Sequence, residues 1–269
     1  MNLLKGWNSS RAIRVIVLVV SALIPAPFAA KAGSDRLWQI VNSECMPGQR
    51  ERGNPAPCSE VNVSKGMDGG FVVLKDQSPT KPHAYLLIPT RRVTGIEAAE
   101  LLEAGTPNYF GEAWTAKSHL IRMLKVSLGW DMVGLAVNSA KDRSQDQLHI
   151  HIDCIRSDIR SALRSNEDVL DDHWSELEFP TPDHSYMTMK FATDSLDGSN
   201  PFKLLADGVP GAKDEMGLET LVVVGSVFRD GKRGFYLLSS RHAAGVRAHG
   251  EDLLDPSCGV ADRAISPPR

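Results

Sequence analysis

The sequence lacks the short motifs that define several large classes of enzyme. It contains no Gly-x-x-x-x-Gly-Lys-Ser/Thr phosphate loop and no Gly-x-Gly-x-x-Gly segment, so ATPase and dinucleotide-binding chemistry have no support. It has no Gly-x-Ser-x-Gly turn of the kind that carries a serine-hydrolase nucleophile. No Cys-x-x-Cys pair occurs, which argues against a thioredoxin-type redox site or a zinc ribbon. Any chemistry must therefore come from side chains in a different pattern.

The chain also lacks an excess of charge of one sign. Its 269 residues include 30 Lys and Arg against 33 Asp and Glu, for a formal net charge of -3. A nucleic-acid partner is not expected, because such partners require a basic surface. Hydrophobic residues make up 42% of the chain, which is enough for the core of one large domain or two small ones.

Long hydrophobic runs are absent except near the N-terminus. There, Lys5, Arg11 and Arg14 precede an apolar segment at residues 15–24, and Ala-Lys-Ala follows at residues 30–32. This segment is shorter than the roughly 20 apolar residues that span a bilayer as a helix. A basic flank, a short apolar run and a small-residue end are typical of an export signal. We therefore predict that residues 1–32 are a cleaved signal peptide or an uncleaved N-terminal membrane anchor.

Cysteine is scarce, and the four residues present are too few for a disulfide-rich scaffold. Export would nevertheless place them in a compartment where disulfides form. Cys45 and Cys58 flank a stretch without periodicity, which predicts a loop closed by a disulfide between them. Cys154 and Cys258 would then form the second bond. Four cysteines allow three connectivities, so this pairing is the preferred one of three.

Strands and helices mix without regular alternation, which predicts an α+β fold with an antiparallel sheet. The longest predicted helix spans residues 111–128, with Trp114 and Leu120 on its apolar stripe and Gly129 as its C-cap. The other expected helices span residues 37–42, 97–104, 157–164 and 202–205. The expected strands span residues 71–75, 85–88, 132–137, 148–155, 186–191, 218–228 and 235–239.

An acidic, proline-containing stretch at residues 166–185 predicts a boundary within the exported body. We expect a first domain at residues 33–165 and a C-terminal α+β half at residues 166–269. The C-terminal half is either a degenerate second copy of the first domain or a lipid-facing addition.

A row of polar side chains is the most informative feature of the sequence. Gln147, His149, His151 and Asp153 alternate with Leu148, Ile150 and Ile152, so a strand would carry the polar row on one face and the apolar residues on the other. Aligned polar groups are costly to bury unless they meet water, a ligand or each other. The row therefore predicts a functional site.

Two chemistries require such a row. His149, His151 and Asp153 could ligate a metal, or an imidazole could attack phosphorus while its neighbours hold the oxyanion. The preceding loop favours phosphoryl chemistry, because its side chains suit phosphate oxygens better than a soft metal. Its candidate substrate-binding residues are Asn138, Arg143, Ser144 and Gln145. His249, in contrast, is expected at the surface.

At these residues the sequence resembles a known superfamily. The segment Gln147-x-His149-x-His151 resembles the His-x-His-x-His motif of histidine-triad nucleotide hydrolases and transferases, and Pro82-His-Ala-Tyr-Leu-Leu-Ile-Pro89 is similar to one of their strands. A closer resemblance, strongest over residues 35–165, is to the bacterial CDP-diacylglycerol pyrophosphatase family. It rests on the segments Leu37-Trp-Gln-Ile-Val, Cys45-Met-Pro, Tyr85-Leu-Leu-Ile-Pro-Thr-Arg, Thr94-Gly-Ile-Glu, Pro107-Asn-Tyr-Phe and Arg143-Ser-Gln-Asp-Gln-Leu-His-Ile-His-Ile-Asp-Cys-Ile-Arg.

The resemblance implies a histidine-triad-like antiparallel sheet with packed helices, and hydrolysis of CDP-diacylglycerol to CMP and phosphatidate. His149 matches the central, nucleophilic histidine, and His151 matches the third. Gln147 replaces the first histidine. Ser144 falls where the superfamily has a phosphate-contacting serine, and Asn138 falls where it has an asparagine on the preceding strand. The glycine expected before that serine is replaced by Asp142 or Arg143. If the motif is instead aligned with His149, His151 and Asp153, then His151 becomes its central residue and the nucleophile.

The mechanism implied by the resemblance requires no metal or cofactor. Its substrate lies in a membrane, so we expect N-terminal membrane association at the bacterial inner membrane, with the body facing the periplasm, or a periplasmic protein if the signal is cleaved. The rival hypothesis is an exported metal- or lipid-binding module that uses His149, His151 and Asp153 without catalysis. Acyl-chain preference and oligomeric state stay open at this point.

Overall fold

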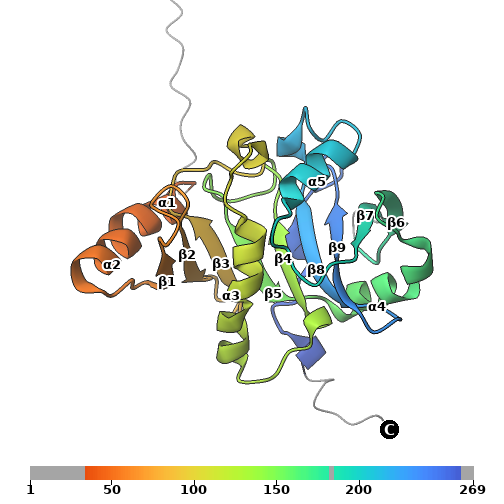
Figure 1. The fold of residues 1–269 in the computed structure, drawn as a ribbon, viewed down its shortest axis with the longest axis horizontal. Coiled ribbons are helices and arrows are strands. Elements are labelled where there is room, and N and C mark those ends of the chain that lie inside the picture. The colour runs from red at the N-terminus through yellow and green to blue at the C-terminus, as the bar shows by residue number, and fades with distance from the viewer. Residues whose placement is uncertain (1–33, 182–184, 262–269) are drawn as a thin grey trace, which may run out of the picture. The chain divides into compact units, whose positions relative to one another are not determined.

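The computed structural model describes residues 34–181 and 185–261 (Figure 1). These described residues belong to one compact unit. The predicted signal or anchor at residues 1–32 lies outside the described residues. Within the described ranges, no helix is both long and apolar enough to cross a membrane.

A nine-stranded antiparallel sheet organises the described chain, which confirms the α+β prediction. Its strands lie in the order β1-β2-β3-β5-β4-β8-β9-β7-β6. They are β1 (Cys58–Asn62), β2 (Phe71–Lys75), β3 (Tyr85–Pro89), β4 (Val133–Val137), β5 (Ile150–Cys154), β6 (Ser175–Glu178), β7 (Ser185–Phe191), β8 (Leu221–Val227) and β9 (Arg233–Ser239). The helices are α1 (Arg36–Gln39), which continues into a π-helical turn (Ile40–Cys45), α2 (Met46–Arg52), α3 (Tyr109–Leu124), α4 (Ser157–Ser165) and α5 (Pro201–Gly208).

The two predicted halves contribute to this one sheet with the same topology. In the first half, β2, β3, α3, β4 and β5 follow one another in the chain, and their strands lie in the order β2-β3-β5-β4. In the second half, β6, β7, α5, β8 and β9 follow in the same way, in the order β6-β7-β9-β8. The inner strands β4 and β8 pair antiparallel, so the two halves meet at the centre of the sheet.

Helices α3 and α5 cover the same face of the sheet (Figure 1). Trp114 and Leu120 from α3 and Phe202 from α5 pack in one core with Ile152 of β5 and Val223 of β8. This burial of an amphipathic helix stripe is the main stabilising contribution on that face.

The opposite face is covered in two separate places. Ile40 and Val41 of the π-helical turn pack on β2 and β3, and Ile159 and Leu163 of α4 pack on β8 and β9. Between these two clusters lies the middle of the sheet, where β5 carries the predicted polar row.

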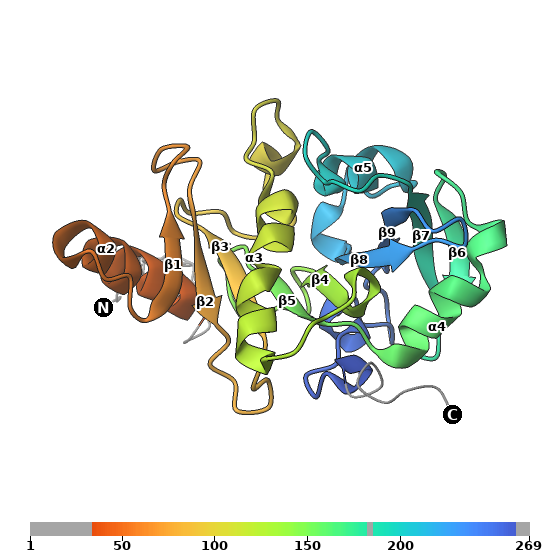
Figure 2. The same cartoon turned by 60° about the horizontal axis from the view of Figure 1, so that its bottom comes forward.

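The C-terminal residues return to this middle region. After β9, residues 241–258, which we call the C-terminal strap, run back beside β4 and β5 (Figure 2). Leu254 bridges to Ile155, and the amide of Ser139 donates to the carbonyl of Ala248 at 3.1 Å. The strap therefore brings residues more than 100 positions away in the sequence to the end of β5.

Both preferred disulfides are present. Cys45 pairs with Cys58 and ties the π-helical turn to β1. Cys154 pairs with Cys258 and ties the strap to the end of β5. The predicted pairing among three connectivities is therefore confirmed.

Several element predictions require correction. Residues 46–57 were expected to be a loop, but Met46–Arg52 form α2, which ends at Gly53 in a left-handed conformation (φ 61°). This helix is largely exposed, so no apolar periodicity marks it in the sequence. The long helix begins at Tyr109 and ends at Leu124, because Asn108 caps its start and Lys125 adopts the left-handed conformation that was expected of Gly129.

Two strands were not predicted at all. These are β1 and β6, which lie at the two edges of the sheet. Edge strands have a neighbour on one side only, and both have mainly half-buried or exposed side chains. Their weak hydrophobic pattern is the reason that the sequence does not reveal them.

Candidate active site

The polar row lies on β5 and just before it, as predicted. His149, His151 and Asp153 are 7%, 5% and 2% exposed, and Ile150 and Ile152 point into the opposite core. His151 pairs with Leu86 of β3 and Ala136 of β4, so it lies in the middle of the sheet. The alternation predicted from the sequence is therefore confirmed, and the polar side is the one that α3 and α5 leave uncovered.

One hydrogen bond defines the protonation of the His149 ring. Its Nδ1 lies 2.7 Å from the carbonyl oxygen of Gln147. A carbonyl only accepts, so Nδ1 carries the proton, and the neutral ring has its lone pair on Nε2. Burial lowers the pKa of His149 below its usual value of 6.5, which keeps the ring neutral near pH 7. His149 lines a cavity of about 340 Å³, called here the smaller cavity.

His151 is surrounded by side chains and has no backbone partner. Its ring centroid lies 4.8 Å from that of His149, with the two planes at 69°. Its Nε2 lies 3.0 Å from Glu251 Oε1, a close contact whose angle falls short of an aligned hydrogen bond. Its Nδ1 lies 4.0 Å from Asp76 Oδ2. Burial holds the pKa of His151 well below 6.5, so this ring is also neutral near pH 7.

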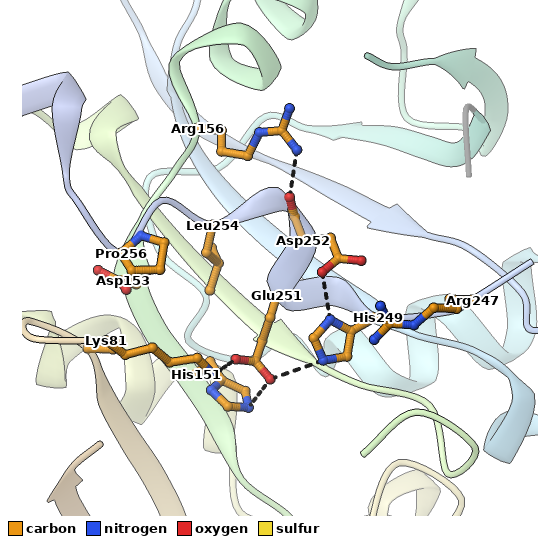
Figure 3. A pocket seen from close by; sticks show the side chains of 11 residues that line it. Lys81, His151, Asp153, Arg156, Arg247, His249, Glu251, Asp252, Leu254 and Pro256 are labelled. Atoms are coloured by element: carbon orange, nitrogen blue, oxygen red, sulfur yellow. Dashed lines mark hydrogen bonds and ion pairs between the residues drawn. The ribbon is translucent and has the colours of Figure 1, made fainter. Parts of the chain in front are cut away.

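A second, larger cavity of about 550 Å³ also has His151 in its lining. Lys81, His151 and Glu251 line both cavities, and Figure 3 shows them in the larger one. A ligand that reaches His149 from one side therefore meets the same three residues as a ligand in the larger cavity.

The predicted substrate-binding residues divide into two groups. Ser144 and Gln145 line the smaller cavity together with His149 and His151. Asn138 lines neither cavity, and its Nδ2 donates to Glu251 Oε1 at 2.6 Å. The structure thus places Ser144 and Gln145 with the two histidines and Asn138 with Glu251.

Arg143 and Gln147 line neither cavity. Arg143 is paired with Glu97 at 2.6 Å and with Asp146 at 3.0 Å, so its charge is already balanced by two carboxylates. Gln147 is fully buried and binds backbone only: its Oε1 accepts from the amide of Val93 at 3.3 Å, and its Nε2 donates to the carbonyls of Pro89 and Arg91. Both side chains hold the loop before β5 in place.

Sequence reasoning missed the residues that complete the site. Asp76 and Lys81 come from the connection between β2 and β3, and His249, Glu251 and Asp252 come from the strap. The expectation that His249 is a surface residue is wrong, because its side chain is 20% exposed and lines the larger cavity (Figure 3). No local pattern in the sequence links these positions to β5, since only the path of the chain brings them there.

Asp153 is a buried acid at the far end of the row. It lines the larger cavity, and its Oδ1 accepts from the amide of Cys154 at 2.8 Å. Burial, with a smaller contribution from nearby Asp255, raises the pKa of Asp153 to about 7. The site therefore contains a carboxyl group that titrates near neutral pH.

The row is not arranged as a three-ligand metal site. Alternate residues on a strand are roughly 6.6 Å apart, and the donor atoms of His149, His151 and Asp153 do not all lie within 4.8 Å of one another. Among the described residues, the His, Cys, Asp and Glu side chains that do converge in this way are Asp171, Asp172 and His173, which are fully exposed. The geometry of the polar row thus favours phosphoryl chemistry over metal ligation.

The fold and site together define an antiparallel α+β protein with a buried pair of neutral histidines between two cavities. Comparison with known proteins identifies its relatives. The chain belongs to the CDP-diacylglycerol pyrophosphatase family, whose model matches residues 32–262. It is 34% identical over 252 residues to a CDP-diacylglycerol pyrophosphatase from Yersinia pestis, an alignment that covers 91% of this chain and 93% of that protein.

Proposed function

We propose that this protein hydrolyses CDP-diacylglycerol to CMP and phosphatidate, with His149 as the nucleophile. Family membership supports the reaction, and the hydrogen bond from His149 Nδ1 to the Gln147 carbonyl is the observation that carries the mechanism. This bond orients a neutral imidazole in the smaller cavity and leaves Nε2 with its lone pair.

The first step is attack of His149 Nε2 on the phosphorus of the cytidylyl group. A nitrogen–phosphorus bond forms, the bond to the bridging oxygen breaks, and phosphatidate leaves with that oxygen. The ring gains positive character, which the Gln147 carbonyl stabilises through Nδ1–H. Water then attacks the phosphorus, the nitrogen–phosphorus bond breaks, and CMP is released.

The surroundings of the two rings favour His149 over His151 as the nucleophile. His149 has a backbone acceptor on Nδ1, so its Nε2 is available to attack. His151 Nε2 instead faces the Glu251 carboxylate at 3.0 Å, where a phosphate group would meet negative charge. Ser144 and Gln145 are the polar groups placed beside His149 to contact the phosphate.

We further propose a histidine-triad type of catalytic domain at residues 33–165, followed by a C-terminal half at residues 166–269 that completes the sheet. The repeated strand order supports the interpretation of the C-terminal half as a degenerate second copy. The apolar segment within residues 1–32 would associate the protein with the bacterial inner membrane, facing the periplasm, or direct it to the periplasm if cleaved. Either location places the body where disulfides form.

The proposed nucleophile is tested by trapping the intermediate with CDP-diacylglycerol labelled in the cytidylyl phosphate. The wild type and His151→Ala should form a labelled protein, whereas His149→Ala should form none and should lose about 10⁴-fold or more in kcat. His173→Ala removes an exposed histidine and serves as the matched control. A labelled His149→Ala protein would move the nucleophile, and full activity in both site variants would contradict the histidine mechanism.

A further inference from the structure

We propose that Glu251, on the C-terminal strap, is a positioning residue that holds His151 in the Nε2-protonated tautomer, so that His151 Nδ1 accepts the proton of the hydrolytic water. The inference rests on the proposed function, because it assigns His151 to the second step of that reaction. It also makes the C-terminal half part of the catalytic machinery.

The contacts of the Glu251 carboxylate are the first line of support. Oε1 accepts a hydrogen bond from Asn138 Nδ2 at 2.6 Å and lies 3.0 Å from His151 Nε2 and 3.5 Å from His249 Nε2. Oε2 pairs with Lys81 Nζ (Figure 3). The side chain is 11% exposed, so these contacts are little screened by water. Both oxygens of the carboxylate therefore have a donor, Asn138 for Oε1 and Lys81 for Oε2.

A charged carboxylate determines which nitrogen of His151 carries the proton. A carboxylate accepts hydrogen bonds only, and an imidazole lone pair aimed at it would be repelled. At 3.0 Å from Oε1, a proton on His151 Nε2 is therefore favoured over a lone pair, which leaves the lone pair of the neutral ring on Nδ1. Neither ring nitrogen has an aligned hydrogen-bond partner among the described residues, and the nearest carboxylate to Nδ1, that of Asp76, is farther away at 4.0 Å.

The two neighbouring histidines consequently hold opposite tautomers. A backbone carbonyl fixes His149 with its proton on Nδ1, and Glu251 fixes His151 with its proton on Nε2. One ring offers a free Nε2 and the other a free Nδ1. Two-step hydrolysis needs a nucleophile and a separate base, and the two free nitrogens supply them.

Glu251 can position His151 because the strap around it is tightly held. The turn Gly250–Leu253 packs so closely on β4 and β8 that a Cβ on Gly250 would lie 2.5 Å from Thr220 Oγ1. The amide of Arg156 donates to the Leu253 carbonyl at 3.0 Å, and the amide of Asp255 donates to the Cys154 carbonyl at 2.8 Å. The strap thus fixes its carboxylate against the end of β5.

The hydrolytic step balances with these groups alone. The water oxygen bonds to the cytidylyl phosphorus, and one of its protons moves to His151 Nδ1. The nitrogen–phosphorus bond breaks, and its electron pair returns to His149 Nε2. Glu251 stabilises the imidazolium formed on His151, which then loses its proton to solvent. The charged and titratable groups that face His151 are His149 just before β5, Asp76 and Lys81 from the β2–β3 connection, and His249 and Glu251 from the strap.

The proposal is tested first on the resting wild type, without turnover. Nitrogen-15 spectra of histidine-labelled full-length protein at pH 7 should show His151 with a protonated Nε2 and an unprotonated Nδ1, the resonances being assigned by their loss in His151→Gln. Glu251→Gln should mix the two tautomers. A wild-type His151 that is protonated on Nδ1, or on both nitrogens, would overturn the assignment.

The second test separates positioning from a merely structural role. In Glu251→Gln, labelled cytidylyl-enzyme should form as in the wild type but decay about 10²-fold more slowly, which lowers kcat without raising KM. Glu178→Gln makes the same chemical change on exposed β6 and is the control. Equal decay rates in the wild type and Glu251→Gln, or loss of formation and decay together, would reject the role of Glu251. Absence of any labelled intermediate in the wild type would instead reject the proposed function.

Discussion

At the scale of single residues, chemistry in this site depends on which atom each polar side chain contacts. His149 and His151 are alike in sequence and burial, yet one binds a carbonyl and the other faces a carboxylate. Ser144 and Gln145 were found from the sequence because they share one loop with the histidines. Lys81 and Glu251 were missed because their neighbours along the chain carry no sign of the cavities they line.

The identity of a charged residue also does not show by itself which groups its side chain contacts. Arg143 stands in the loop where a phosphate-binding arginine is expected. Glu97 and Asp146 occupy its guanidinium, and Glu97 lies 46 positions away in the sequence. Lys81 is the cation that lines both cavities beside the histidines.

Asp153 gives a prediction for the dependence of stability on pH. Its pKa is about 7 in the folded protein and near 3.8 when exposed, so the folded state binds this proton more strongly than the unfolded chain. The contribution of Asp153 to stability therefore falls as pH rises from about 4 to 7, by at most about 4 kcal/mol. Asp153→Asn should remove this loss, because the amide oxygen can still accept from the Cys154 amide.

Urea unfolding of both proteins at pH 5 and pH 8, with disulfides intact, measures the difference. The variant should gain stability relative to the wild type at both pH values, and the gain at pH 8 should be more than twice the gain at pH 5. An equal difference at the two pH values would show that Asp153 does not titrate in this range.

At the scale of elements, the strongest predictions were those with a regular hydrophobic period. Strand β2 spans residues 71–75 as predicted, and β5 shows the predicted alternation of faces. Helix α3 was found from its apolar stripe, but its ends were misplaced, because capping depends on the backbone conformations of Asn108 and Lys125. Edge strands and the exposed helix α2 were missed, since they bury too little to leave a pattern.

Helix α3 should contribute heavily to stability through its buried stripe. Leu120 is fully buried in the core beneath the sheet, so Leu120→Ala should lower the free energy of unfolding by about 2–5 kcal/mol. Met123, on the same helix, is 42% exposed, and Met123→Ala should change it by less than about 0.5 kcal/mol. Chemical denaturation of the two variants checks this, and equal losses would mean that α3 does not pack as described.

At the scale of the whole molecule, the repeated topology gives the two halves different tasks. His151 pairs with Leu86 and Ala136, and in the same row across the sheet Leu238 of β9 pairs with Thr188 and Val222. The C-terminal half therefore has an apolar residue in the row that carries His151, and α4 covers that part of the sheet. Its contribution to the site comes from the strap instead.

The Cys154–Cys258 disulfide holds this strap, which gives a prediction about the two disulfides. It closes a span of 104 residues, so Cys154→Ala with Cys258→Ala should cost about 4–5 kcal/mol of stability on a chain-entropy estimate. Cys45→Ala with Cys58→Ala opens a span of only 13 residues and should cost about 3 kcal/mol.

The double variant Cys154→Ala with Cys258→Ala should also have a lower kcat in conditions where the protein stays folded, because the strap carries Glu251. Unfolding curves and turnover of CDP-diacylglycerol by the two double variants provide the comparison. A larger fall in kcat for the Cys45–Cys58 pair would contradict this role of the strap.

The sequence by itself determined the fold class, the polar face of β5 and the family, because each depends on patterns of residues close together in the chain. It favoured one of three disulfide pairings, and the structure decided in favour of that one. Only the tertiary structure decided what surrounds the histidines. Lys81 and Glu251 meet His151 because the sheet order and the returning strap bring distant segments together. Such contacts depend on the path of the chain, which leaves no local period in the sequence.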